Sequence, residues 1–193
     1  MSGWKDKLIG FLETNGAIAG EDREVYEYTL KIIAILGGNI MISLLIGFGL
    51  GVPLYCMMLL FSIIVLRSDA GGYHADNMWV CYFLSCMGLM GALLWIKAEI
   101  PYQALITVCM AVPSYFFVFR NAPLEAENKP LTQIEKKIIG RRARIIVTVE
   151  MAAGLICLVI DKKSACTIMC SVIWCAIGYI GWFMKKKRKL DMT

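Results

Sequence analysis

Long apolar runs separated by short polar segments dominate this chain of 193 residues. Because about twenty apolar residues in a helix cross the hydrocarbon core of a bilayer, these runs predict six transmembrane helices. The strands of an outer-membrane barrel would show alternating apolar and polar residues, whereas these runs are continuously apolar. An even number of spans places both termini on one side. The predicted spans, of which the second is short, are residues 32–51, 54–66, 78–96, 102–119, 145–160 and 165–183.

The segment before the first span has a helical pattern of its own. Its apolar residues recur at i, i+4, i+7 and i+8 and share one helix face: Trp4, Leu8, Phe11 and Leu12. We predict that residues 1–30 form an interfacial arm that starts with an amphipathic helix in the headgroup region. The alternative is an ordinary surface helix packed on the bundle. We predict no cleavable signal peptide, because charged residues interrupt the apolar ones.

Composition and charge set the class and the orientation. The chain is 59% hydrophobic and 18% charged, with a mean hydropathy of +0.65. A soluble domain of this size has too little interior to bury so much apolar surface. We therefore predict one all-α polytopic membrane domain over residues 1–193. If the N-terminus is cytoplasmic, 17 of the 20 Lys and Arg residues face the cytoplasm and 3 face outside, as the positive-inside rule demands.

This orientation divides the chain into functional segments. Residues 31–119 hold spans one to four, residues 120–144 form a basic cytoplasmic loop, and residues 145–193 hold the last two spans and a basic tail. The polar island at 67–81 also faces the cytoplasm, where cysteines stay reduced. None of the eight cysteines has metal-ligand spacing. We expect no metal site, no cofactor and no nucleic-acid partner.

The polar island holds the candidate chemistry. It contains the only histidine, His74, and seven residues later Cys81. A neutral imidazole can accept a thiol proton, and a thiolate is a strong nucleophile near neutral pH. The sequence therefore favours a cysteine nucleophile at the membrane surface. The alternative is a structural histidine beside a cysteine that packs as a small apolar residue.

Helix geometry adds a condition to this dyad. Seven residues of continuous helix rise about 10.5 Å, and side chains lean toward the helix N-terminus, so His74 would point away from Cys81. A dyad requires a break, which Gly71-Gly72 would supply. His74 would then lie in a loop and fold back over the first turn of the next helix, with Cys81 four or five residues inside that helix.

Further polar residues are candidates for support of the dyad. Asp69 and Asp76 could orient the imidazole, although Asp76 could equally cap the third span. Arg67 could bind a carboxylate or an oxyanion, or it could anchor in headgroups. Ser85, one turn after Cys81, could supply a hydroxyl. Glu150, a carboxylate inside the fifth span, could pair with Arg142 or Arg144 or lie near the dyad.

The pattern Arg67-x-x-x-Gly71-Gly72-x-His74-Ala75, followed by Cys81 at the start of the third of six spans, resembles the AgrB family. These are the membrane-embedded peptidases of accessory gene regulator quorum-sensing systems. The resemblance extends to the loop from Asn121 to Leu131, to the chain length and to the span plan. It implies a bacterial cytoplasmic membrane protein with its active site on the cytoplasmic side.

The resemblance also implies a reaction and a partner. His74 would act as general base, and Cys81 would attack a small AgrD-like propeptide and hold it as a thioester. A thiol or hydroxyl of the peptide would then close a thiolactone or lactone ring. The acidic tail of such a substrate suits a basic segment, whose alternative role is to bind anionic headgroups of the bilayer. Its candidate residues are Lys129, Lys136, Lys137, Arg141, Arg142 and Arg144.

Two other classes of function stay open at this point. Six spans could form a small transporter or exporter subunit without peptidase activity, or a membrane protein with a purely structural or assembly role. Neither an inverted repeat nor a nucleotide-binding motif supports transport. Small residues allow close helix contact within one chain or in a homodimer: Gly47, Gly49, Gly51, Gly88 and Gly91. No residue pattern in the sequence specifies the substrate peptide, the ring size of its product or a third catalytic group.

Overall fold

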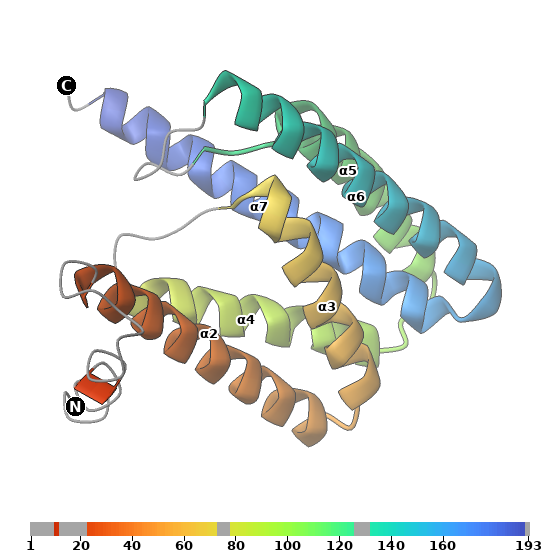
Figure 1. Cartoon of the computed structure of the whole chain (residues 1–193). Helices are drawn as coiled ribbons and strands as arrows, with labels where there is room; N and C mark the ends of the chain where they lie inside the picture. The colour runs from red at the N-terminus through yellow and green to blue at the C-terminus, as the bar shows by residue number, and fades with distance from the viewer. Residues whose placement is uncertain (1–9, 12–22, 73–77, 126–131, 192–193) are drawn as a thin grey trace. The chain divides into compact units, whose positions relative to one another are not determined.

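The computed structural model describes residues 10–11, 23–72, 78–125 and 132–191, and all regular structure within these ranges is α-helical (Figure 1). The prediction of an all-α fold is therefore confirmed. The chain divides into two units, residues 1–42 and 43–193, with the boundary inside the first long helix. The long helices are α2 (Arg23–Gly49), α3 (Pro53–Ala70), α4 (Met78–Lys97), α5 (Gln103–Asn121), α6 (Gln133–Ile160) and α7 (Lys162–Leu190).

Five of these helices, α3 to α7, are long and apolar enough to cross a membrane, and α2 contains a shorter apolar stretch, Ile33–Gly49. Large apolar side chains on their outer surfaces are exposed, such as Phe61 at 70% and Val159 at 91%. Lipid solvates such side chains, whereas water would not. These helices have the character of a multi-pass membrane protein.

The described part of the first unit is mainly the start of α2. This helix runs without a break from Arg23 into the first apolar stretch. Arg23 forms an i,i+4 ion pair of 3.1 Å with Glu27 on its exposed surface. Apart from Phe11, the residues of the predicted amphipathic helix lie outside the described ranges.

The second unit is built around α7, which contacts α3, α4, α5 and α6. About half of the apolar, membrane-length part of α7 is buried against the other helices. Small residues permit close approach between helices: the Trp174 ring of α7 lies directly on Gly88 of α4, and Met169 lies on Gly154 of α6. Helix packing in this unit therefore depends on glycines opposite large side chains.

One end of the second unit is closed by polar contacts at the turn between α6 and α7. The Asp161 carboxylate accepts hydrogen bonds from the backbone N–H groups of Lys163 (3.1 Å) and Ser164 (3.0 Å), which caps α7. Tyr55 of α3 donates its hydroxyl to the same carboxylate. Lys163 also forms an ion pair with Glu99, which follows α4. This end therefore joins α3, α4, α6 and α7.

Replacement of Asp161 by alanine is expected to cost about 1 kcal/mol of stability at neutral pH, because it removes this cap. The hydrogen bond from the Ser164 hydroxyl, with the backbone N–H groups, holds the pKa of the Asp161 carboxyl below its usual range. A lowered pKa stabilises the fold above the unfolded-state pKa of about 3.9, and that contribution is lost as the pH falls through the folded-state pKa.

The difference in thermal midpoint between wild type and Asp161→Ala in detergent should therefore shrink when the pH is lowered from 7 to 3. Asp161→Asn is the matched control, because an amide caps a helix but does not titrate. If the thermal midpoints of wild type and Asp161→Ala differed by the same amount at both pH values, the charged Asp161 cap could not be the source of this stability.

The basic segment 120–144 is mainly helix, which corrects the prediction of a loop. A capping box starts α6 one residue before Gln133: the Thr132 hydroxyl accepts from the Glu135 N–H, and the Glu135 carboxylate accepts from the Thr132 N–H at 2.9 Å. Four orphan N–H groups at a helix start need such partners. The helix can therefore begin in the polar region, about three turns before the expected span.

Candidate active site

The end of α3 provides the predicted helix break. The helix stops at Ala70, and Gly71 adopts a φ of +77° and a ψ of −170° that only glycine adopts readily. Its N–H still bonds to the Arg67 carbonyl at 3.1 Å. Residues 67–81 therefore do not form one helix, because α4 begins only at Met78. The predicted break at Gly71-Gly72 is confirmed.

A segment distant in the sequence lies directly against this break. The N–H of Leu124, which follows α5, donates to the Ala70 carbonyl at 3.0 Å. A Cβ on Gly71 would lie 2.7 Å from the Leu124 carbonyl oxygen. On the other side, Pro123 packs against Gly140 of α6. The break is thus held between the end of α3 and the segment that leads into the basic helix.

Cys81 is the fourth residue of α4, and its side chain is half-buried. Ser85 donates its hydroxyl to the Cys81 carbonyl at 2.9 Å, which is an ordinary bond for a serine one turn later in a helix. Ser85 therefore supports the backbone at Cys81, and its hydroxyl proton is already used.

Cys81 and Ala70 lie at the same end of the second unit. Trp174 packs on Gly88, and Lys163 at the start of α7 pairs with Glu99 beyond the end of α4, so α4 and α7 are antiparallel. Cys81 precedes Gly88 by about two helical turns, and the α7 residues beyond Trp174 extend in the same direction. The candidate nucleophile and the helix break therefore share the end opposite the Asp161 turn.

Three predicted site residues, His74, Asp76 and Lys129, lie outside the described residues. Their proposed roles stay predictions from the sequence. Arg67 is half-buried in the last turn of α3, and its guanidinium packs against Gly72. Arg67 precedes His74 by seven residues in the sequence, and Asp69 is half-buried in the same turn of α3.

Glu150 is buried in α6 at 8% exposure. Its carboxylate accepts a hydrogen bond of 2.7 Å from the Ser171 hydroxyl of α7. Arg144, one of its two predicted partners, instead donates from Nε to the Phe119 carbonyl at 3.2 Å and lies over the Phe119 ring. The structure therefore joins Glu150 of α6 to Ser171 of α7.

The predicted substrate-binding cations other than Lys129, which lies outside the described residues, are exposed on α6. Lys137, Arg141 and Arg144 follow one another at helical spacing and form a stripe. Lys136 forms an ion pair of 2.8 Å with Glu125, and Arg142 is exposed. Arg144 and Arg120 flank an open groove of about 460 Å³ that also includes Phe116 and Phe119. Long basic side chains beside aromatic rings suit an anionic or amphipathic ligand.

The remaining cysteines are in the apolar interior or on helix surfaces, as expected of packing residues. Cys56, Cys166, Cys170 and Cys175 are buried. Within the described ranges no group of three His, Cys, Asp or Glu side chains could hold a metal ion. Cys81, Cys86 and Cys157 are half-buried, and Cys109 is exposed.

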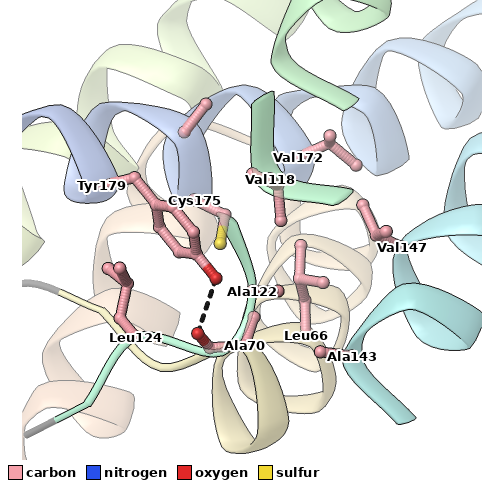
Figure 2. Close-up of a cluster of buried hydrophobic side chains, with 11 residues drawn as sticks. Leu66, Ala70, Val118, Ala122, Leu124, Ala143, Val147, Val172, Cys175 and Tyr179 are labelled. Carbon is pink, nitrogen blue, oxygen red and sulfur yellow. Dashed lines mark hydrogen bonds between the residues drawn. The ribbon is translucent and has the colours of Figure 1, made fainter. Parts of the chain in front are cut away.

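One residue that sequence reasoning missed is Tyr179 of α7. Its side chain is fully buried, and its hydroxyl donates to the Ala70 carbonyl at 2.6 Å (Figure 2). Tyrosine is amphipathic and usually finds a partner for its hydroxyl when buried. A tyrosine inside an apolar run was the available signal, but the partner, 109 residues earlier, was not visible in the sequence.

Comparisons with known proteins agree with the resemblance drawn from the Gly71-Gly72 motif. The family description "AgrB: Accessory gene regulator B" matches residues 5–179. "Putative AgrB-like protein 2" of Clostridium perfringens strain 13 is 26% identical over 170 residues, which cover 84% of this chain and 79% of the relative. "Putative AgrB-like protein" of strain SM101 matches with the same identity and coverage. No solved structure matches the chain.

Proposed function

Because the chain belongs to the accessory gene regulator B family, we propose that it is a membrane-embedded cysteine peptidase that cuts and cyclises a small propeptide. Membership of this family supports a part in accessory gene regulator propeptide processing. The proposal adds the mechanism: Cys81 as nucleophile, His74 as general base, and an AgrD-like propeptide as substrate.

The proposed reaction has two acyl transfers. His74 accepts the Cys81 thiol proton while sulfur attacks the scissile carbonyl carbon, and the C–N bond then breaks as the departing amine of the C-terminal tail takes that proton. The remaining peptide is held as a thioester on Cys81. A thiol or hydroxyl of the same peptide attacks this carbonyl, closes the ring and returns the proton to Cys81. One peptide bond is exchanged for one thioester or ester bond.

The observation that best supports this mechanism is the helix break at Gly71 combined with a half-buried Cys81 in the first turns of α4. The break allows a loop before α4 to turn back over the helix start, which one continuous helix would prevent. A half-buried thiol can reach a substrate while neighbouring apolar side chains limit access of water. Limited water is needed because hydrolysis of the thioester competes with ring closure.

The basic side of α6 supports a role in substrate binding. Pro123 packs on Gly140 of α6, and Leu124 bonds to Ala70, so the start of this helix is tied to the end of α3. We propose that Lys137 and Arg141 in this stripe, with Lys129 and Lys136, attract an acidic propeptide tail toward Cys81. Anionic headgroups would use the same charges. By the distribution of Lys and Arg, the site faces the cytoplasm from the bacterial cytoplasmic membrane.

The proposal is tested by trapping the acyl-enzyme. Purified protein in liposomes is incubated with a panel of synthetic AgrD-like propeptides in which the ring-closing residue is replaced by alanine, so that the thioester cannot be resolved by cyclisation. Intact mass should increase by the mass of the peptide without its tail, and peptide mapping should place this group on Cys81. An acyl group on Cys86 or on another cysteine would overturn the assignment of the nucleophile.

A further inference from the structure

A single backbone oxygen at the end of α3 accepts two hydrogen bonds from distant parts of the chain. Tyr179 of α7 donates its hydroxyl to the Ala70 carbonyl at 2.6 Å, and Leu124 donates its N–H to the same oxygen at 3.0 Å. Figure 2 shows the tyrosine ring crossing from α7 with its hydroxyl directed at Ala70. Three segments of the bundle therefore meet at Ala70.

The surroundings hold this arrangement in one geometry. Both Ala70 and Tyr179 are completely buried, and a cluster of small and branched apolar side chains encloses them. The tyrosine ring also packs edge-on against Phe117 of α5. This hydrogen bond has little freedom to lengthen, because a buried tyrosine hydroxyl left without a partner would cost about 1–3 kcal/mol. The last carbonyl of α3 is thus fixed in direction.

The chain that leaves this point leads to the proposed general base. Gly71 follows Ala70 with a left-handed φ and lies against the Leu124 carbonyl, and Gly72 lies under the Arg67 guanidinium. His74 is two residues further along the sequence. The direction in which Gly71 and Gly72 leave Ala70 is therefore the direction in which the chain sets out toward His74.

We propose that Tyr179 is a positioning residue of the peptidase, which acts through the Ala70 carbonyl to set the direction in which the chain leaves α3 toward His74. This inference rests on the proposed function. Tyr179 does not touch the reacting atoms; it holds the end of α3 so that the imidazole can reach Cys81. Because Leu124 supplies a second bond to Ala70, loss of the tyrosine hydroxyl should shift Gly71 and Gly72 without leaving the carbonyl unpaired.

Tyr179→Phe tests the inference, because it removes the hydroxyl and keeps the packed ring. In liposomes with an AgrD-like propeptide, kcat should fall about tenfold while KM changes by less than about twofold. Tyr115→Phe is the matched control: its hydroxyl bonds to Thr148 between α5 and α6, away from Ala70. We expect the control to keep the wild-type kcat. A Tyr179→Phe variant with wild-type kcat would overturn the positioning role.

Two further measurements separate positioning from general stability and from the proposed function. Hydrogen exchange at Gly71 and Gly72 should be faster in Tyr179→Phe at a thermal midpoint close to that of Tyr115→Phe. The rate of Cys81 alkylation by iodoacetamide needs no propeptide. The Cys81 alkylation rate should fall in Tyr179→Phe toward the rate of His74→Ala. If the wild-type protein cleaves no propeptide, the proposed function fails. In that case slower alkylation of Tyr179→Phe would still support the positioning role, and an alkylation rate equal to that of wild type would reject the positioning role.

Discussion

Cys81→Ala is expected to abolish propeptide cleavage, with a loss of roughly 10⁴-fold or more, while the protein stays folded. The physical reason is that the proposed first step forms a bond to the Cys81 sulfur, for which alanine has no substitute. Cys81 is half-buried in a helix, and alanine is an excellent helix former, so we expect a change in stability below about 1 kcal/mol. Cleavage is measured in liposomes by mass spectrometry of the released tail.

Cys86→Ala is the matched control for this experiment. Cys86 is a half-buried cysteine on the same helix, five residues further into the membrane, and it has no proposed role. The Cys86→Ala variant should cleave the propeptide at the wild-type rate. His74→Ala should lose as much activity as Cys81→Ala, because a nucleophile and its base act as a unit. Undiminished cleavage by Cys81→Ala would reject the peptidase mechanism.

Gly71→Ala is expected to produce the second largest effect, a loss of both stability and cleavage. A residue other than glycine at this φ and ψ costs about 1–3 kcal/mol in backbone strain. The added Cβ would also lie 2.7 Å from the Leu124 carbonyl, which is a backbone atom and cannot rotate away. Relief of either conflict must turn the chain after Ala70. We therefore expect at least about a tenfold lower cleavage rate, together with a lower thermal midpoint.

Gly91→Ala is the control for the general effect of adding a methyl group. Gly91 is exposed in α4, and a Cβ there would meet no atom within 4 Å. Alanine in a helix interior is favoured over glycine by about 1 kcal/mol, so this variant should be as stable as wild type or more so. If Gly71→Ala retained both the wild-type thermal midpoint and the wild-type rate, the close contact at Leu124 could not be important.

The sequence predicted the site best where the prediction depended on local chemistry. The glycine pair ended a helix because glycine accepts a positive φ, and Cys81 fell in the first turns of the next helix. The start of α6 was predicted poorly, although Thr132 and Glu135 carry the signature of a capping box. Apolarity located the span but not the helix, because a helix can extend into water wherever its first N–H groups find partners.

The sequence by itself determined that this is an all-α, multi-pass protein in which a glycine pair ends one helix before the single histidine and Cys81. Those features follow from apolar runs, from glycine and from charge, which act over a few residues. Only the tertiary structure decided that Ala70, Leu124 and Tyr179 meet at one carbonyl and that Glu150 bonds to Ser171. Such partners lie far apart in the chain, and only the packing of helices on α7 brings them within hydrogen-bonding distance.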